Sequence, residues 1–279
     1  MSGSQSAVIA AADAAARAAR DGRTPEQLMD ELLFAARGKA IAPISGFAVG
    51  AVARGRSGAL YLGANLEFPG HPLNASVHAE QAAAVSAWAH GEPGIDALAA
   101  SETPCGHCRQ FLNELATGGA LPVFVHGKPP LTLNDLLPLS FGPADLHVTA
   151  ALMSHEPRRL RLVRPDDERA EPQLMTAALR AAEQAYAPYG KTFAGLALAL
   201  DDGSIRSGRY AECAAFNPSL PPLQAALSGL ALDGVPFARI RAAALVETAG
   251  AVGQRAATEA LFATVAPGVA LRYAQAEPA

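Results

Sequence analysis

His78-Ala79-Glu80 and Pro104-Cys105-Gly106-His107-Cys108 begin and end the stretch that decides the fold of this 279-residue chain. One imidazole and two thiolates form a three-ligand zinc set, which in a catalytic site leaves a fourth position for water. Zinc lowers the pKa of such a water towards neutrality. Glu80 is close enough in sequence to His78 to carry protons between that water and a substrate. We therefore predict His78, Cys105 and Cys108 as zinc ligands and Glu80 as the general acid and base.

The spacing of these residues predicts that all three ligands lie at the tips of helices. Helix-forming residues run from Ala82, so His78 falls in or just before the first turn of a helix. Pro104 suits the start of a second helix, where Cys105 and Cys108 share a face. Helix N-termini lower thiol pKa values, which favours the thiolate forms that bind zinc.

The remaining cysteine and histidines show no ligand pattern. His107 lies between the two cysteines and is a rival ligand, but the zinc set is complete without it. Cys213 stands beside Glu212, far from the motif, and is expected to be a packing residue. The other histidines are expected on the surface or in loops; they are His71, His90, His126, His147 and His155.

Composition narrows the classes of function and location. Half of the residues are hydrophobic, which is enough for two compact domains. A net charge of -4 is unfavourable for a protein that must bind a nucleic-acid backbone. Three cysteines, two of them in the C-x-x-C, do not form a disulfide framework, so a reducing cytoplasm is expected. No apolar run reaches the length of a membrane span, and the N-terminus lacks the pattern of an export signal.

The chain repeats itself at an interval of about 145 residues. Residues 42–51 are echoed by residues 187–196 with one insertion, and Gly63-Ala64-Asn65-Leu66-Glu67 is echoed by Gly208-Arg209-Tyr210-Ala211-Glu212. The repeat therefore covers most of both halves of the chain.

The second copy has lost the zinc residues. His78-Ala79-Glu80-Gln81 falls on Pro221-Pro222-Leu223-Gln224, so the metal histidine becomes proline and the proton-transfer glutamate becomes leucine. Glu102-Thr103-Pro104-Cys105 corresponds to Glu247-Thr248-Ala249-Gly250, and no C-x-x-C follows. We expect the second half to keep the scaffold without the chemistry.

Both halves show the same order of elements, which predicts an α/β fold. In the first half we expect a helix at 28–40, strands at 47–53 and 59–63, the zinc helix, a strand at 95–100, the cysteine helix and a strand at 121–125. In the second half we expect a helix at 174–186, a hairpin around 201–203, and strands near 241–246 and 269–273. Strands separated by helices imply a mixed sheet with helices on both faces, that is, two three-layer α/β/α domains.

This order gives four parts of the chain. Residues 1–25 form a short helical N-terminal arm, and residues 26–153 form the catalytic zinc-binding domain. Residues 154–172 carry five arginines and five acidic residues and are interpreted as a charge-balanced linker rather than a nucleic-acid patch. Residues 173–279 form the degenerate domain.

Four segments of the chain resemble the long, homodimeric type of bacterial cytidine deaminase. They are His78-Ala79-Glu80-Gln81, Thr103-Pro104-Cys105-Gly106-His107-Cys108-Arg109-Gln110-Phe111, Ser140-Phe141-Gly142-Pro143 and Ala215-Phe216-Asn217-Pro218-Ser219-Leu220-Pro221-Pro222-Leu223-Gln224. The H-x-E…P-C-x-x-C pattern is the general signature of zinc-dependent base deaminases. The similarity extends over nearly the whole chain, including the degenerate half.

The resemblance implies roles for further residues, all of them substrate contacts. Phe47 would stack on the pyrimidine, and Asn65 and Glu67 would bind the ribose hydroxyls; as alternate residues of a strand, these two can face one ligand. The backbone of Ala79 would meet the base carbonyl, and the Thr103 carbonyl would face the leaving ammonia. Phe141 would reach into the active site of the other subunit of a homodimer. Members of the family usually have an asparagine after the stacking phenylalanine, where this chain has Ala48.

The implied reaction is the zinc-dependent hydrolytic deamination of cytidine and deoxycytidine, in pyrimidine salvage in the cytoplasm. One zinc ion per subunit is expected, and no membrane or nucleic-acid partner. Deaminases that act on a nucleotide or on single-stranded nucleic acid share the motif, but the latter should have a basic groove with stacking aromatics. This chain is acidic, with 6% aromatic residues, and Glu67 near the sugar disfavours a phosphate. A purely structural zinc site is the third alternative, but it would be closed by a fourth protein ligand.

Overall fold

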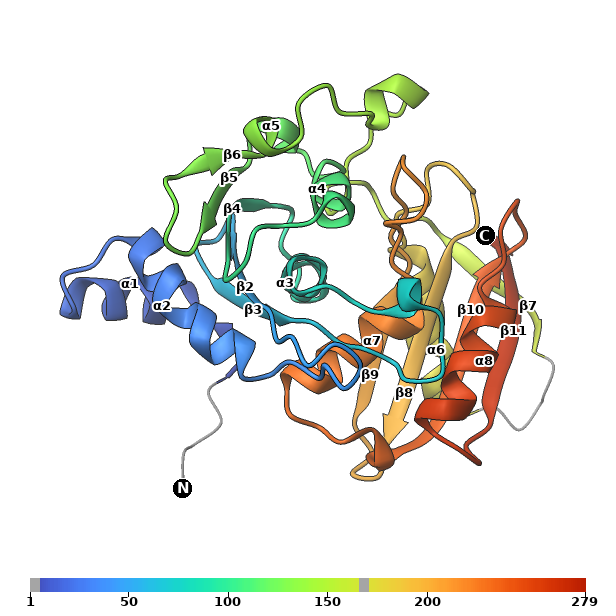
Figure 1. The fold of residues 1–279 in the computed structure, drawn as a ribbon. Helices are drawn as coiled ribbons and strands as arrows, with labels where there is room; N and C mark the ends of the chain where they lie inside the picture. Colours follow the sequence, from blue (N-terminus) through green and yellow to red (C-terminus); the bar gives the residue numbers. More distant parts are fainter. Residues whose placement is uncertain (1–5, 166–170) are drawn as a thin grey trace. The chain divides into compact units, whose positions relative to one another are not determined.

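The structure, a computed structural model, describes residues 6–165 and 171–279 (Figure 1). The chain divides into two compact units. The first unit contains the residues up to Ser154 with Cys213–Pro218 and Ala231–Gly234, and the second contains His155–Glu212, Ser219–Leu230 and Val235–Ala279. Each unit has its own sheet. The domain bounds at residues 25, 153 and 172 stay a prediction.

The sheet of the first unit is mixed. It runs in the order β1-β3-β2-β4-β5-β6, in which β4 and β5 are parallel and the other neighbours are antiparallel. The strands are β1 (Val8–Ile9), β2 (Gly50–Gly55), β3 (Leu60–Ala64), β4 (Ile95–Ala100), β5 (Pro122–Val125) and β6 (Leu131–Thr132). Because the residues of β3 and most of those of β2 and β4 are buried, both faces of the sheet centre are covered.

The helices of the first unit begin where the sequence offers caps. They are α1 (Ala11–Arg20), α2 (Pro25–Arg37), α3 (Ala79–Ala89), α4 (Gly106–Leu112) and α5 (Leu133–Leu136), with short 3-10 turns at Leu73–Ala75, Gly118–Ala120 and Pro143–Leu146. Thr24 caps α2 in a capping box with Gln27, and Pro25 occupies the first position, where its missing N–H costs nothing. The predicted zinc and cysteine helices correspond to α3 and α4.

Two glycines let α2 and α3 pack directly on the sheet backbone. A Cβ at Gly50 would lie 2.5 Å from the backbone nitrogen of Arg37, and one at Gly63 would lie 2.2 Å from the carbonyl oxygen of Ala79. Gly63 pairs with Ala51, the neighbour of Gly50. Because paired residues share a face and successive residues alternate, α2 and α3 cover opposite faces (Figure 1). The first unit therefore has three layers.

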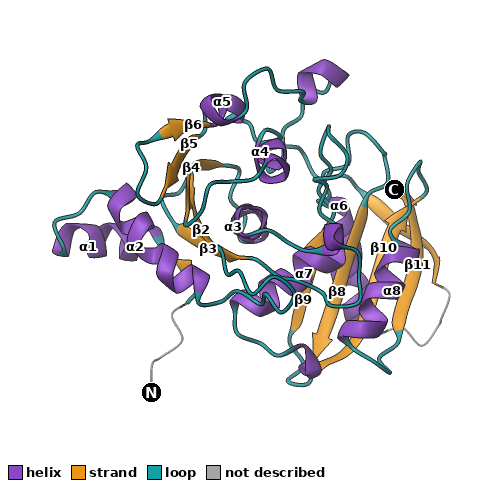
Figure 2. Cartoon of the chain, in the orientation of Figure 1, coloured by secondary structure: helices purple, strands orange, loops and turns teal. Residues whose placement is uncertain are grey.

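The second unit repeats this plan. Its sheet runs in the order β7-β11-β10-β8-β9, with β10 and β11 parallel (Figure 2). The elements are β7 (Leu160–Pro165), α6 (Pro172–Glu183), β8 (Ala194–Leu200), β9 (Ile205–Arg209), α7 (Pro222–Leu232), a 3-10 turn (Phe237–Arg239), β10 (Ile240–Thr248), α8 (Arg255–Val265) and β11 (Leu271–Pro278). None of the helices in the described ranges has the length and apolar character needed to cross a membrane.

The contact glycines of the first unit recur in the second. A Cβ at Gly195 would lie 2.2 Å from the backbone nitrogen of Ala182 in α6, and one at Gly208 would lie 2.1 Å from the carbonyl oxygen of Pro222 in α7. Gly208 pairs with Leu196, the neighbour of Gly195, so α6 and α7 also cover opposite faces. The predicted fold class, two repeated three-layer α/β/α domains, is confirmed.

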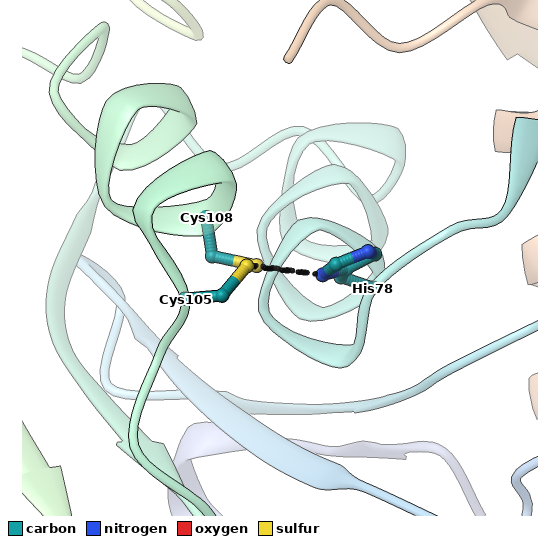
Figure 3. A group of neighbouring side chains, drawn as sticks. All are labelled: His78, Cys105 and Cys108. Atoms are coloured by element: carbon teal, nitrogen blue, oxygen red, sulfur yellow. Dashed lines mark hydrogen bonds between the residues drawn. The ribbon is translucent and has the colours of Figure 1, made fainter. Parts of the chain in front are cut away.

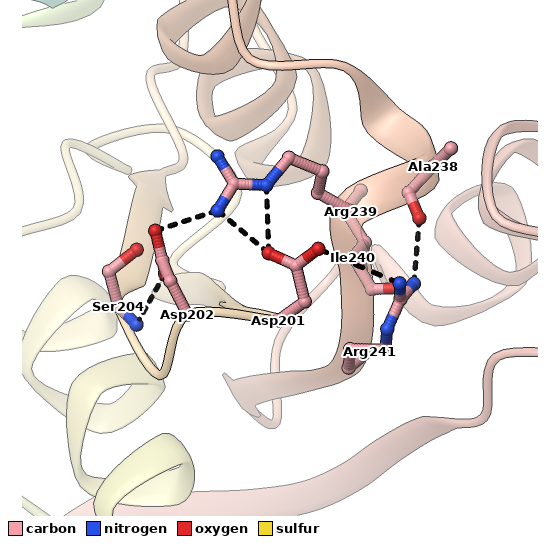
Figure 4. Close-up of polar contacts among 7 residues, drawn as sticks. All are labelled: Asp201, Asp202, Ser204, Ala238, Arg239, Ile240 and Arg241. Carbon is pink, nitrogen blue, oxygen red and sulfur yellow. Dashed lines mark hydrogen bonds and ion pairs between the residues drawn. The ribbon is translucent and has the colours of Figure 1, made fainter.

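A charged network fixes the turn between β8 and β9 (Figure 4). Arg239 donates to Asp201 through Nε and to Asp202 through Nη2, both at 2.7 Å. Asp202 also accepts from the backbone nitrogen of Ser204 at 2.9 Å, and Arg241 lies 3.7 Å from Asp201. These groups are partly exposed, so the network positions the turn more than it stabilises the unit.

The short strand β6 was not predicted from the sequence, and neither were two strands that pair with distant segments, β1 and β7. The N-terminal arm contains the expected helix, α1, but β1 precedes it and pairs with β3. Within the predicted linker, β7 joins the edge of the second sheet by antiparallel pairing with β11. Both strands form through pairing with residues distant in sequence, which local composition does not reveal. Residues 1–5 of the arm and 166–170 of the linker lie outside the described residues.

Candidate active site

The three predicted zinc ligands meet between the tips of α3 and α4 (Figure 3). His78 is the N-cap residue of α3, Cys105 is the N-cap residue of α4, and Cys108 lies in the first turn of α4. His78 Nδ1 is 3.4 Å from Cys105 Sγ and 3.3 Å from Cys108 Sγ, and the two sulfurs are 3.7 Å apart. Among the described residues, this is the one group of three or more histidine, cysteine or acidic side chains whose ligand atoms lie close enough to hold a metal.

Glu80 points at the same place from the first turn of α3. Its side chain is 4% exposed, and the Cys108 thiol donates to Glu80 Oε2 at 3.2 Å. Burial, which disfavours the charged carboxylate, raises the pKa of Glu80. The carboxyl group is therefore suited to accept and return a proton beside the ligand atoms.

The two cysteines have different surroundings. The hydrogen bond between the two cysteines, and next the one with His78, lower the pKa of Cys105 to about 3. The hydrogen bond with Cys105 and burial raise the pKa of Cys108. Cys105 is the exposed member of the pair and Cys108 the buried one.

His107, the rival ligand, supports the site rather than joining the ligand group. Its ring stacks on that of His78, with centroids 4.9 Å apart and an interplanar angle of 23°. The adjacent Arg109 donates to the carbonyl oxygens of Pro104 at 2.7 Å and of Leu136 at 2.5 Å, which fixes the segment that enters α4. Arg109 was not among the predicted site residues, although its place directly after the C-x-x-C was a signal.

A cavity of about 380 Å³ opens beside these residues in the first unit. Its size suits a small ligand. Its walls include most of the predicted site and several residues that the sequence did not single out; they are Ile44, Ser45, Phe47, Val49, Asn65, Glu67, Leu73, Ser76, Val77, His78, Ala79, Glu80, Glu102, Thr103 and Cys105. All five predicted substrate contacts other than Phe141 therefore line one cavity with the metal group.

Asn65 and Glu67 also hold the loop that carries Phe47. Asn65 accepts from the backbone nitrogen of Val49 at 2.8 Å and donates to the carbonyl oxygen of Phe47 at 3.0 Å. Glu67 accepts from the backbone nitrogens of Ile44 at 2.8 Å and Ser45 at 3.0 Å, and from the Ser45 hydroxyl. Burial raises the pKa of Glu67, but the hydrogen bonds from Ser45 and Ile44 outweigh it, so the pKa is lowered and the carboxylate stays charged.

Phe141 lies away from this cavity. It is not among the lining residues, and its side chain is 48% exposed. Gln110 of α4 donates to the Phe141 carbonyl oxygen at 2.8 Å, which holds the loop against the helix that carries the cysteines. The structure of the single chain thus brings nine of the ten predicted site residues together and leaves Phe141 on the surface.

Two family models match the chain. Both describe the "Cytidine and deoxycytidylate deaminase zinc-binding region", one over residues 23–120 and the other over residues 133–259. The first match contains the His78, Cys105 and Cys108 group, and the second falls mainly on the degenerate copy.

The curated relatives agree with the family models. The chain is 47% identical over 233 residues to the cytidine deaminase of Serratia proteamaculans, covering 84% of this chain and 77% of the relative. It is 48% identical over 231 residues to the cytidine deaminase of Yersinia pestis, covering 83% of this chain and 76% of the relative. The crystal structure of the Mycobacterium tuberculosis cytidine deaminase aligns at 32% identity over 43% of this chain and 98% of that chain, with a TM-score of 0.40. The crystal structure of the Burkholderia pseudomallei cytidine deaminase aligns at 32% identity over 41% of this chain and 98% of that chain, with a TM-score of 0.37.

The donor set fits the metal that the family description names. One imidazole nitrogen and two sulfurs are typical ligands of zinc, and a three-ligand set keeps a position open for catalysis. Zinc is therefore the cofactor. With its metal group, its cavity and its similarity to named relatives over most of their length, the chain belongs to the cytidine deaminase family and is a zinc-dependent hydrolase of that type.

Proposed function

We propose that this enzyme converts both cytidine and deoxycytidine to the uracil nucleosides and ammonia, with Glu80 moving the protons. The observation that carries the proposal is the place of Glu80, a buried carboxyl that lines the substrate-sized cavity and lies 3.2 Å from a zinc-binding sulfur. A zinc ion held by His78, Cys105 and Cys108 supplies an acidified water that can act as a nucleophile at neutral pH.

Glu80 links the two proton transfers of the reaction. It accepts a proton from the attacking water and returns it to N3 of the base; it then takes the proton of the new C4 hydroxyl and passes it to the amine. The C4–N bond breaks as the C4 carbonyl forms, so water is consumed and ammonia leaves. A carboxyl group whose pKa is raised by burial suits this exchange, because a general acid and base works best when its pKa is closer to the operating pH.

The other cavity residues position the nucleoside. The backbone nitrogen of Ala79 begins α3 and has no acceptor within the helix, so it is free to bind the base carbonyl. Phe47, 52% exposed, offers its ring to the pyrimidine, and the carbonyl of Thr103 faces the departing ammonia. Asn65 and Glu67 meet the ribose hydroxyls.

We predict that the enzyme prefers a nucleoside to its 5′-monophosphate. The charged Glu67 carboxylate in the sugar region repels a phosphate and accepts from a hydroxyl, so kcat/KM for cytidine should exceed that for CMP by about tenfold or more. An ultraviolet assay of both substrates measures the ratio. Equal turnover of the two would contradict the proposed place of the sugar, and Glu67→Gln should raise KM for cytidine.

We also propose that the protein works in pyrimidine salvage in the cytoplasm. Free nucleosides are its substrates, and Cys105 and Cys108 bind zinc only as reduced thiolates. All three cysteines are free thiols. A reducing compartment preserves them.

Exposed aromatic and aliphatic side chains support the proposal of a homodimer in which Phe141 enters the site of the other subunit. In the first unit, Leu139 has a φ of 54° and is fully exposed, and Phe216 has a φ of 61° and is 67% exposed. Leu139 directly precedes the segment that contains Phe141, and Phe216 lies in another of the segments that resemble the family. Large apolar residues on strained backbone are costly on a free surface.

Light scattering should therefore give twice the chain mass of 28.6 kDa. Phe141→Ala should lower kcat/KM by about tenfold while zinc content stays unchanged, because a contact to the bound nucleoside is lost. Phe34→Ala is the matched control, since Phe34 is also exposed but lies on α2. A fully active monomer, or equal losses in the two variants, would refute the proposal.

A further inference from the structure

The second unit has a cavity of its own, two of whose wall residues correspond by the repeat to wall residues of the substrate cavity in the first unit. It measures about 310 Å³, and its walls include Arg158, Arg159, Lys191, Phe193, Thr248 and Ala249. By the repeat, Phe193 corresponds to Phe47 and Thr248 to Thr103. The degenerate copy, which lacks the metal residues, therefore still has a cavity beside the counterparts of Phe47 and Thr103.

The charge of this cavity is opposite to that of the first. Three carboxylates, Glu67, Glu80 and Glu102, line the first cavity, which has no lysine or arginine in its walls. Two arginines and a lysine line the second, and none of the described residues in its walls is acidic. Within residues 6–165 and 171–279, no carboxylate forms an ion pair with Arg158, Arg159 or Lys191. An unpaired cluster of like charges in a hollow attracts an anion.

Arg158 is held in place before any ligand arrives. Its guanidinium carbon lies 4.1 Å from the centroid of the Phe193 ring, in a cation–π contact. Its backbone nitrogen donates to the carbonyl oxygen of Glu183 at 2.8 Å, and the carbonyl oxygen of Arg159 accepts from Ala279 at 3.1 Å. Because the guanidinium covers the ring that corresponds to Phe47, a base cannot stack there as proposed for the first cavity. The ligand must be recognised through its charge.

Lys191 occupies a backbone position that favours glycine. Its φ is 57°, and the equivalent residue of the first copy is Gly46, with φ 65°. The loop is held in the same way in both copies, since Glu212 accepts from the backbone nitrogens of Tyr189 and Gly190 as Glu67 does in the first. The fold therefore needs this backbone conformation but not a lysine, and the strain points to a function of the side chain.

We propose that this cavity of the second unit binds a small anion that carries a phosphate group. Two planar guanidinium groups and an ammonium group match the oxygens of a phosphate. The volume is at the lower end for ligand sites, which suits inorganic phosphate or a sugar phosphate.

Isothermal titration of the zinc-loaded enzyme with inorganic phosphate, ribose 5-phosphate and uncharged ribose tests the proposal. Saturable binding of at least one phosphate probe, weakened by added salt, is expected, with no binding of ribose at this cavity. Stronger binding of ribose 5-phosphate than of inorganic phosphate would identify a sugar phosphate as the ligand, and the reverse order would identify free phosphate. Absence of saturable binding for both phosphate probes would overturn the proposal.

Three variants locate the binding site. Arg158→Ala and Lys191→Gly should each weaken phosphate binding by about tenfold or more, because each removes a charge-assisted hydrogen bond. Lys191→Gly should also raise the thermal unfolding temperature, since glycine relieves the positive φ, so lost binding cannot be attributed to misfolding. Arg180 is an exposed arginine of α6, and Arg180→Ala should change neither phosphate binding nor the thermal unfolding temperature. Phosphate binding that survives both cavity variants would place the anion elsewhere and refute the assignment.

Discussion

Glu80→Gln should lower kcat for cytidine by about 10²- to 10⁴-fold while the enzyme keeps its zinc, because Glu80 is proposed as the general acid and base. Glutamine preserves the shape of the side chain but cannot exchange a proton with water and base. Because the Glu80 side chain is only 4% exposed to solvent, its replacement by a neutral side chain should not lower the thermal unfolding temperature. An ultraviolet assay of cytidine turnover and metal analysis of the same sample measure both properties.

The comparison of Glu80→Gln with Glu80→Ala separates proton transfer from packing. Both variants lack the carboxyl group, so both should lose activity to a similar degree, although only alanine leaves a cavity. Near-normal turnover in either variant with full zinc occupancy would contradict the role proposed for Glu80. Loss of zinc from both would show instead that the carboxylate is needed to hold the metal.

Cys105→Ala should empty the zinc site and abolish turnover with it. Two of the three ligands remain, and a set of two is too small for a stable tetrahedral site. Cys105 tests this more cleanly than Cys108, because Cys105 is exposed and its loss leaves no hole in the core, whereas Cys108 is buried. Metal analysis after dialysis gives the zinc content, and the activity assay follows the same samples.

Cys213→Ala is the matched control for this experiment. It also removes one thiol, from a side chain that is 0% exposed, but the sulfur donates to the carbonyl oxygen of Gln110 at 3.5 Å and is not part of the ligand group. Its zinc content should stay at the wild-type level, although packing loss should lower its stability. Full zinc in Cys105→Ala, or empty sites in Cys213→Ala, would overturn the ligand assignment.

The features that the sequence could predict are those that depend on local spacing. The capping position of His78 and the C-x-x-C at the start of α4 follow from helix geometry, and β4 has the predicted bounds of Ile95–Ala100. The other boundaries shift by a few residues, as for β2, which begins at Gly50 rather than Phe47 because the loop before it is tied to Asn65 and Glu67.

The features that the sequence could not predict depend on contacts between distant segments. Pairing of β7 with β11 and the hydrogen bonds of Glu67 to the Ile44 and Ser45 backbone have no local signature. The cluster of Arg158, Arg159 and Lys191 in the second unit has no local signature either, because Arg158 and Phe193 are distant in sequence and come into contact only in the folded unit. The proposed role of Phe141, a contact with the active site of the other subunit, depends on a second chain.

The four contact glycines show which part of an ancestral unit resists change after duplication. Gly195 and Gly208 sit in the copy that has exchanged its histidine for proline and its glutamate for leucine, yet each still touches a helix backbone as Gly50 and Gly63 do. A catalytic side chain can be replaced without disturbing its neighbours, whereas a methyl group at any of these glycines would push a helix off its sheet. A duplicated enzyme domain that no longer catalyses thus cannot accept a side chain at its layer contacts, whereas the residues that line its cavity can change and bind another ligand.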